Sequence, residues 1–189
     1  PPMFTVIKVT KGYGPKKLFE DVNVAFSPGR RYGLTGPNGA GKSTFMKILS
    51  GDLEPDTGTV SRPKRLGILR QDHFQFEEER VLDVVLRGNV TLWAALQEKE
   101  ILLAKADITE EDGNRLGDLE GVIAEEDGYE AESAAAALLM GLGIDTASHE
   151  GPLKELTGGL KLRVLLAQAL FGKPEGLLLD EPTNNLDLE

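Results

Sequence analysis

The chain has 189 residues, of which 40% are hydrophobic, and it carries a formal net charge of −10. This length suits one core-forming domain with at most a small appendage. The sequence has no run of 18 apolar residues and no basic segment followed by an apolar stretch near its start, so it predicts neither membrane insertion nor a signal peptide. The chain contains no cysteine, which excludes disulfides and cysteine-ligated zinc and fits a cytoplasmic location.

The negative charge is concentrated in the middle of the chain. Residues 71–150 hold 20 acidic side chains against 5 basic ones, whereas the remaining residues hold 11 against 16. An acidic surface repels phosphate backbones, so this segment is a poor candidate for broad, direct contact with nucleic acid. Its simplest interpretation is a solvated helix surface.

The first third of the chain predicts short strands separated by turns, followed by one helix. Gly12-Tyr13-Gly14 and Pro28-Gly29 break the β-prone runs, and Gly51 ends the helix. The expected strands are 4–9, 22–26, 32–35, 58–61 and 66–70, and the expected helix is 42–49.

The middle of the chain predicts two paired helices. Apolar residues recur at helical spacing in two successive segments and form one stripe in each. Thr109 and Asp112 make a capping box at the start of the second helix. The stripes consist of Leu92, Leu96 and Leu103, and of Leu116, Leu119 and Ile123.

After Pro152 the pattern predicts a helix at 158–171 and a buried strand at 176–180. The expected fold class is therefore α/β, with a β-rich start, parallel core strands and a helical subdomain inserted between them. We predict a core made of 1–71 and 151–189, and a helical subdomain at 72–150.

The most specific motif is the stretch 36–43, which reads Gly-Pro-Asn-Gly-Ala-Gly-Lys-Ser and matches G-x4-G-K-[ST] between a β-run and a helix. Backbone N–H groups of such a loop converge on phosphate oxygens, Lys42 bridges the β- and γ-phosphates, and the Ser43 hydroxyl ligates Mg²⁺. The alternative is a plain glycine-rich turn. Composition alone would produce the pattern in about one or two of a hundred such chains, so we predict phosphate binding.

Two further segments are weaker taken alone. Asp180 and Glu181 end an apolar strand, where one carboxylate can ligate Mg²⁺ and the next can activate water, although an acidic turn is a common structural feature. Thr157, Gly158 and Gly159 open an apolar helix whose positive end suits a phosphate, although Thr157 can also be an ordinary N-cap.

In this order, the motifs resemble those of the ATP-binding-cassette family, a class of P-loop NTPases that use ATP and Mg²⁺. The resemblance implies that Tyr13 stacks on adenine, that Gln71 touches Mg²⁺ and the attacking water, that Asp180 ligates Mg²⁺ and that Glu181 is the general base. Tyr13 packed on a strand edge and Gln71 as a solvated amide are the alternatives. The nucleotide-binding set implied by the family comprises Tyr13, Asn38, Gly39, Ala40, Gly41, Lys42, Ser43 and Thr44, with Thr157, Gly158 and Gly159 facing the ATP of a second cassette.

Three features resemble the ABC-F class, whose twin-cassette ATPases act on ribosomes and tRNA. The run 181–187 reads Glu-Pro-Thr-Asn-Asn-Leu-Asp, and within it Asn184 and Asn185 replace the small residues that transporters commonly have at this turn. The third feature is the spacing, since 85 residues separate Gln71 from Thr157, as in a chain with a helical arm. The stretches 69–72 and 161–171 look most like the bacterial YbiT-type branch. The resemblance therefore implies the first cassette of an ATP-hydrolysing translation factor.

The sequence departs from the family pattern at Thr157, where serine is usual, and at Leu160, where glutamine is usual. The chain stops at Glu189, before the switch histidine, so we expect a cassette truncated after its Walker B strand and D-loop, with weak activity alone. It would need a second cassette, either in the full-length chain or by head-to-tail dimerisation. The alternative is the ATP-binding subunit of a membrane transporter, docked on a permease.

Overall fold

The computed structural model describes residues 4–28, 40–69 and 74–179. These residues pack into two compact units. One unit contains the described residues up to Leu69 together with 174–179, and the other contains 74–173.

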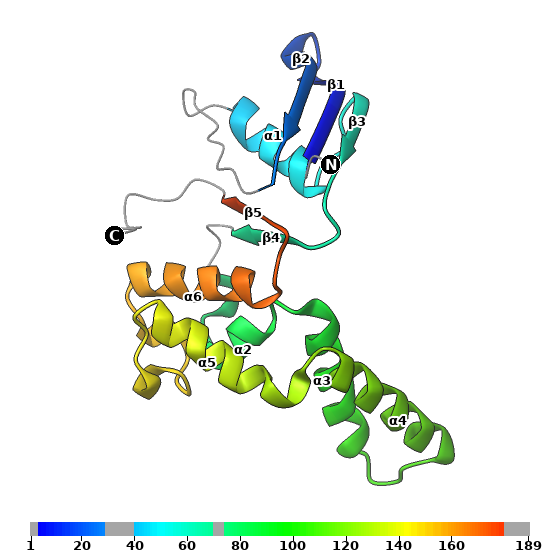
Figure 1. The fold of residues 1–189 in the computed structure, drawn as a ribbon, viewed down its shortest axis with the longest axis vertical. Helices are drawn as coiled ribbons and strands as arrows, with labels where there is room; N and C mark the ends of the chain where they lie inside the picture. The colour runs from blue at the N-terminus through cyan, green and yellow to red at the C-terminus, as the bar shows by residue number, and fades with distance from the viewer. Residues whose placement is uncertain (1–3, 29–39, 70–73, 180–189) are drawn as a thin grey trace. The chain divides into compact units, whose positions relative to one another are not determined.

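The first unit begins with an antiparallel sheet in the order β2-β1-β3, formed by β1 (Phe4–Tyr13), β2 (Lys16–Phe26) and β3 (Thr57–Ser61) (Figure 1). Strands β1 and β2 are longer than the predicted 4–9 and 22–26, because the polar residues between those runs pair across a hairpin that closes at Tyr13 and Lys16. The predicted break at Gly12-Tyr13-Gly14 is therefore the hairpin turn itself.

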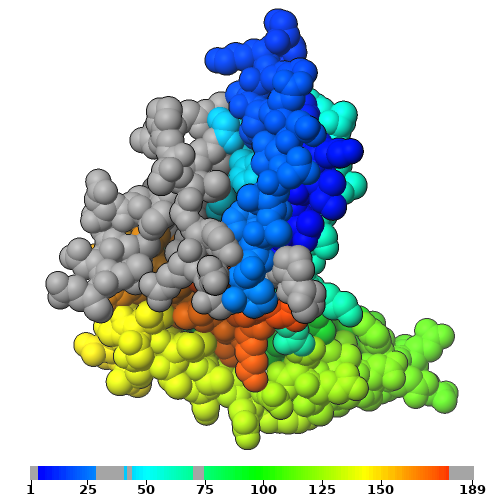
Figure 2. Space-filling model, turned by 45° about the horizontal axis from the view of Figure 1, so that its top comes forward, coloured from blue at the N-terminus to red at the C-terminus, as the bar shows by residue number. Residues whose placement is uncertain are grey.

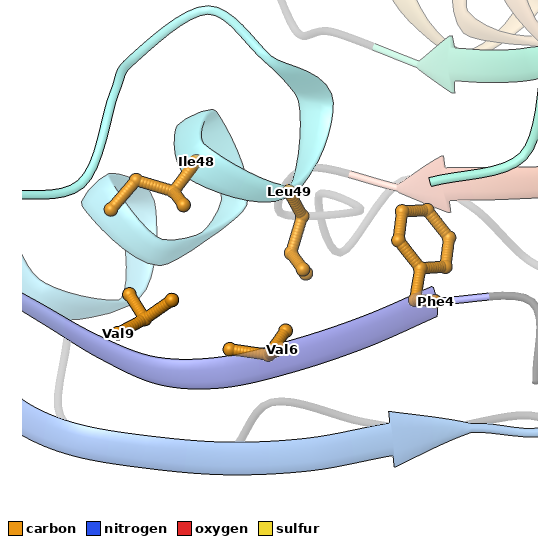
Figure 3. Packing of buried hydrophobic residues seen from close by; sticks show 5 residues of the cluster. All are labelled: Phe4, Val6, Val9, Ile48 and Leu49. Carbon is orange, nitrogen blue, oxygen red and sulfur yellow. The ribbon is translucent and has the colours of Figure 1, made fainter. Parts of the chain in front are cut away.

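Helix α1 (Ala40–Ser50) covers this sheet and confirms the predicted helix at 42–49. Figure 3 shows Ile48 and Leu49 of the helix pointing toward Phe4, Val6 and Val9 of β1. All five side chains are at most 5% exposed. Because Phe4, Val6 and Val9 lie on one face of β1, this helix and strand bury their apolar faces against each other.

A second, two-stranded sheet is parallel and pairs β4 (Leu66–Leu69) with β5 (Gly176–Leu179). Leu66 and Leu178 pack against the same core as α1. This parallel pairing confirms the expected parallel core strands. Residue 70 and the predicted strand 32–35 lie outside the described residues.

The second unit is helical and is centred on the short helix α2 (Val81–Leu86), which packs on α5 (Ala131–Gly141) and α6 (Gly158–Phe171). Gly88 lets the chain after α2 approach α6 closely, since a Cβ at this position would lie 1.8 Å from the Gln168 carbonyl oxygen. The Gln168 amide in turn donates to the Val84 carbonyl at 2.8 Å. The unit also contains short 3₁₀ turns at Phe74–Phe76, Gly128–Glu130, Thr146–Ser148 and Leu153–Glu155.

Helices α3 (Val90–Leu103) and α4 (Glu110–Glu125) form a hairpin that projects from the rest of the helical unit (Figures 1 and 2). The predicted capping box is present, because the Asp112 N–H donates to the Thr109 hydroxyl and the Thr109 N–H donates to the Asp112 carboxylate, both at 3.1 Å. Leu119 and Ile123 are buried as predicted, each 2% exposed.

The stripe predicted for α3 is partly wrong. Leu92 is buried, but Leu103 is 55% exposed and Leu102 is buried in its place. The path of the partner helix decides which side chain of the last turn faces inward, and sequence spacing along α3 alone does not contain that path.

The helical unit extends beyond the predicted subdomain 72–150, because α6 packs on α2 and α5. Lys161 on α6 reinforces this packing through an ion pair with Glu77, 2.9 Å between Nζ and Oε1. The division at 72 and 150 stays a prediction about family architecture, whereas the packing divides the chain after 69 and after 173.

Replacing Ile48 tests the core between α1 and β1. We expect Ile48→Ala to lower the free energy of unfolding by about 2–5 kcal/mol, because a fully buried side chain leaves a cavity that its neighbours fill only partly. The matched control is Ile101→Ala, at a site 66% exposed, with an expected change within about 0.5 kcal/mol. Urea unfolding measures both, and equal losses would contradict the assignment of Ile48 to the core.

Candidate functional site

The N-terminus of α1 is the centre of the candidate site. The helix begins at Ala40, within the glycine-rich stretch 36–43, and its first turn contains Gly41, Lys42 and Ser43 but no acidic residue. Its first four N–H groups have no carbonyl partner inside the helix, and the aligned peptide dipoles favour an anion there. Among the described residues, no atom lies within 4 Å of a Cβ added at Gly41. This end of α1 is therefore suited to phosphate oxygens.

The structure describes only part of the predicted phosphate loop. Thr44 is described and is 6% exposed, so it belongs to the packed side of the first turns. Asn38 and Gly39 lie outside the described residues, as do the side chains of Ala40, Lys42 and Ser43. The roles of these side chains stay predictions.

An aromatic contact holds the start of α1 on the sheet. The ring of Phe45 meets the ring of Phe19 on β2 edge to face, with centroids 5.5 Å apart. This geometry is the favoured one for an aromatic pair. Since Phe45 follows Ser43 and Thr44 directly, the contact fixes the beginning of the helix as well as its middle.

The carboxyl ends of β4 and β5 lie at one edge of the parallel sheet, because Leu69 pairs with Leu179. Gln71 follows β4 by two residues, and Asp180 and Glu181 follow β5 directly. These three residues lie outside the described part of the chain. In open α/β sheets, ligands bind at the carboxyl ends of parallel strands, so the pairing supports the prediction that these groups act at one place.

Tyr13 ends β1 and is 58% exposed. The ammonium of Lys11 lies 5.5 Å from the centroid of its ring, within the range of a cation–π contact. This exposure argues against the alternative of a ring packed on the strand edge. Stacking on adenine stays a prediction for which the ring is accessible.

Asp56 contacts the same turn, and it was not identified from the sequence as a candidate site residue. Its carboxylate accepts from Lys11 Nζ at 2.9 Å and from the Gly12 N–H at 3.0 Å. The hydrogen bond from Lys11, followed by that from Gly12, holds the pKa of Asp56 below its usual value. The only signal in the sequence is local, an aspartate in the turn Pro55-Asp56-Thr57-Gly58, where short acids often bond to backbone N–H groups.

Thr157, Gly158 and Gly159 lie at the start of α6 in the helical unit. Thr157 is the N-cap, and its hydroxyl accepts from the Leu160 N–H at a long 3.5 Å. Thr157 therefore acts as an N-cap of α6, as the alternative interpretation of this residue predicted. The first turn holds no acid, and within the described part of the chain no atom lies within 4 Å of a Cβ added at Gly158.

The described residues contain neither a metal-binding cluster nor a membrane-spanning helix. Among the described residues, no group of three or more histidine, aspartate or glutamate side chains converges as a metal site. Within the same residues, every helix is too short or too polar to cross a bilayer.

Helix α1, which begins within a G-x4-G-K-[ST] sequence, shares its core with the parallel strands β4 and β5, an arrangement that fits a nucleotide-binding cassette. The family model for "ABC transporter" matches residues 19–184, and the chain belongs to this family. It is an ABC ATP-binding domain, and its family is one of ATPases that use Mg²⁺.

The curated relatives agree. The chain is 54% identical over 189 residues to the ABC transporter ATP-binding protein YkpA of Bacillus subtilis and, again at 54%, to the ATP-binding protein YbiT of Escherichia coli O157:H7. It is 34% identical to the energy-dependent translational throttle protein EttA of Mycobacterium tuberculosis. These matches confirm the predicted resemblance to YbiT-type cassettes. Each covers 99% of this chain but only 34–36% of the relative.

Solved structures confirm the fold. A dimeric bacterial ABC transporter cassette superposes with a TM-score of 0.66 at 22% identity, covering 98% of this chain and 76% of that one. CbiO1 from Clostridium perfringens, part of an ABC transporter complex, has the same TM-score at 23% identity, covering 98% and 68%. The predicted class, an α/β P-loop NTPase of ABC type with a helical subdomain, is therefore correct.

The cap at Thr157 generates a prediction about α6. We expect Thr157→Ala to lower the free energy of unfolding by about 0.5–1 kcal/mol, in the lower part of the range for N-caps, because the hydroxyl bond is long and exposed. Thr157→Ser keeps the hydroxyl and should unfold at nearly the parental urea midpoint. A serine variant as unstable as the alanine variant would show that the hydroxyl is not what caps the helix.

Proposed function

We propose that this chain binds Mg-ATP at the N-terminus of α1 and hydrolyses it as one cassette of an ABC-F-type ATPase that acts on the ribosome. The observation that carries the nucleotide site is the packing of α1 on its sheet, because the acid-free first turn of this helix is formed by the last four residues of the G-x4-G-K-[ST] sequence. Support for the ribosomal role comes from EttA, the energy-dependent translational throttle protein that is 34% identical to this chain.

In this proposal the triphosphate lies on the backbone N–H groups of residues 39–44. Lys42 supplies a charge to the β- and γ-phosphates, and Tyr13 supplies an aromatic surface to the adenine. The residues that would hold Mg²⁺ are Ser43, Gln71 and Asp180, oxygen donors of the kind this ion prefers. When bound, the ion neutralises charge on the phosphate oxygens.

Glu181 is the proposed general base, and Gln71 the residue that orients the attacking water. A carboxylate that accepts a proton from water contributes by general base catalysis, and an amide side chain places the water through hydrogen bonds. Thr157, Gly158 and Gly159 are proposed to contact the γ-phosphate held by a second cassette. The site is then completed only when two cassettes meet head to tail, so that the phosphate loop of each faces residues 157–159 of the other.

A second candidate function is the ATP-binding subunit of a membrane transporter, because the family model and YkpA both carry the transporter description. The two candidates share the nucleotide site and differ in the partner. A transporter subunit would co-purify with a permease, whereas an ABC-F protein would sediment with ribosomes when its ATP is retained.

The phosphate site predicts that Lys42→Ala weakens ATP binding at least tenfold, or about 1.4 kcal/mol, through loss of a charge-assisted contact. The matched control is Lys47→Ala, an exposed lysine in the last turn of the same helix, which should bind ATP as the parent does. Calorimetric titration with Mg-ATP measures both. An unchanged dissociation constant for Lys42→Ala would overturn the site.

The assignment of the base predicts that Glu181→Gln, in the complete gene product, slows ATP hydrolysis by about 10²–10⁴-fold and preserves ATP binding. The amide keeps the shape of the side chain but cannot accept the proton. Glu175→Gln, an exposed acid just before β5, is the control and should hydrolyse normally. Parental turnover by Glu181→Gln would show that another group is the base.

The same Glu181→Gln variant separates the two functions through its partner. With ATP retained, it should sediment with purified 70S ribosomes, and adding Lys42→Ala should abolish this sedimentation. Absence from ribosomes together with a co-purifying integral membrane protein would favour the transporter.

A further inference from the structure

The turn that carries Tyr13 lies at the end of the β1–β2 pairing. The β1–β2 pairing shifts register between Lys11 and Gly12, so the hydrogen-bond ladder between the two strands is irregular at the end of β1. Gly12 is tightly packed, because an added Cβ would lie 2.7 Å from the Lys16 carbonyl oxygen. This turn therefore depends on contacts from outside the hairpin for its position.

Asp56 provides those contacts across 44 and 45 residues of sequence. One carboxylate oxygen accepts from Lys11 Nζ at 2.9 Å, and the other accepts from the Gly12 N–H at 3.0 Å. The backbone N–H of Asp56 donates to the Thr10 carbonyl oxygen at 2.9 Å. Three consecutive residues before Tyr13 are thus bound to one aspartate.

Asp56 is in turn connected to the helix that opens at the phosphate site. The segment leaving α1 folds back on the helix, where the N–H groups of Asp52 and Leu53 donate to the Lys47 carbonyl oxygen at 2.9 and 3.2 Å. Arg62, at the far end of β3, donates to the carbonyl oxygens of Leu49 and Ile48 at 3.0 and 2.9 Å. The loop that presents Asp56 is therefore bounded on both sides by contacts to α1.

Lys11 connects the aspartate to the ring itself. Its side chain is only 13% exposed although it carries a charge, and its ammonium lies both against Asp56 and 5.5 Å from the centroid of the Tyr13 ring. A buried ammonium needs such a partner, and without Asp56 it would move toward water. The orientation of the ring thus depends on a charge that Asp56 holds in place.

We propose that Asp56 is a positioning residue that holds Tyr13 at a set distance from the N-terminus of α1, so that the ring meets the base of a nucleotide whose phosphates lie there. The inference rests on the proposed nucleotide site and adds a residue to it. Asp56 touches neither phosphate nor base. It acts through Gly12 and Lys11, and its loss should therefore affect only ligands that carry a base.

Two ligands separate these effects, Mg-ATP and inorganic tripolyphosphate, titrated calorimetrically into the complete gene product. Tyr13→Ala should weaken ATP about tenfold, since stacking on one base is worth roughly that much, and should leave tripolyphosphate unchanged. Asp56→Ala should weaken ATP about three- to tenfold, again with no change for tripolyphosphate. The double variant should bind ATP no more weakly than Tyr13→Ala alone, because coupled residues are not additive.

Two further variants guard against a trivial loss of folding. Asp56→Asn keeps an oxygen for the Gly12 N–H but loses the charge opposite Lys11, and it should fall between parent and Asp56→Ala. Glu54→Ala, an exposed acid in the same loop, should bind both ligands as the parent does. Unfolding midpoints of all variants show whether each is folded at the temperature of the titration.

The outcomes distinguish failure of this inference from failure of the nucleotide site. Equal weakening of ATP and tripolyphosphate by Asp56→Ala, or additive losses in the double variant, would overturn the positioning role. So would parental ATP binding by a folded Asp56→Ala. Tyr13→Ala without effect, beside a clear loss in Lys42→Ala, would overturn the role of this turn but leave the phosphate site standing. Only parental binding by Lys42→Ala would overturn the site itself.

Discussion

The packing of α1 against β1 is the contact on which the rest of the candidate site depends. Ile48 and Leu49 are buried against Phe4, Val6 and Val9, and burial of each such side chain contributes about 1.5–3 kcal/mol. A helix is rigid along its length, so fixing its middle and end fixes the direction of its first turn. The parallel strands join the same core through Leu66 and Leu178.

The two ends of α1 differ in the charged groups near them, in the sense that the helix dipole favours. At the C-terminal end, the Arg62 guanidinium covers the carbonyl oxygens of Ile48 and Leu49, where a cation is favoured. At the N-terminal end the first turn contains no carboxylate to occupy the free N–H groups. The protein thus covers carbonyl oxygens at the C-terminal end of the helix with a cation, whereas the first turn at the other end contains no acid.

The helical unit repeats this arrangement at α6. Its first turn is also free of acid, Thr157 caps it by a long bond, and the Lys161–Glu77 ion pair ties it to the chain that leads from the Gln71 segment. A weak cap is easily exchanged for a better acceptor, since a phosphate oxygen carries more charge than a hydroxyl. The first turns of α1 and α6 are alike in containing no acidic residue.

The sequence by itself determined what depends on near neighbours in the chain: the helix after the phosphate loop, the bounds of α6, the Thr109–Asp112 capping box and the buried pair Leu119 and Ile123. Caps and apolar spacing act within one or two turns, so they can be read without the fold. Only the tertiary structure decided that Leu102 rather than Leu103 is buried, that α6 joins the helical unit, and that Asp56 meets Gly12. These contacts join residues that the chain brings together from elsewhere, and an aspartate in a turn looks the same in the sequence whether or not a partner 44 residues away returns to meet it.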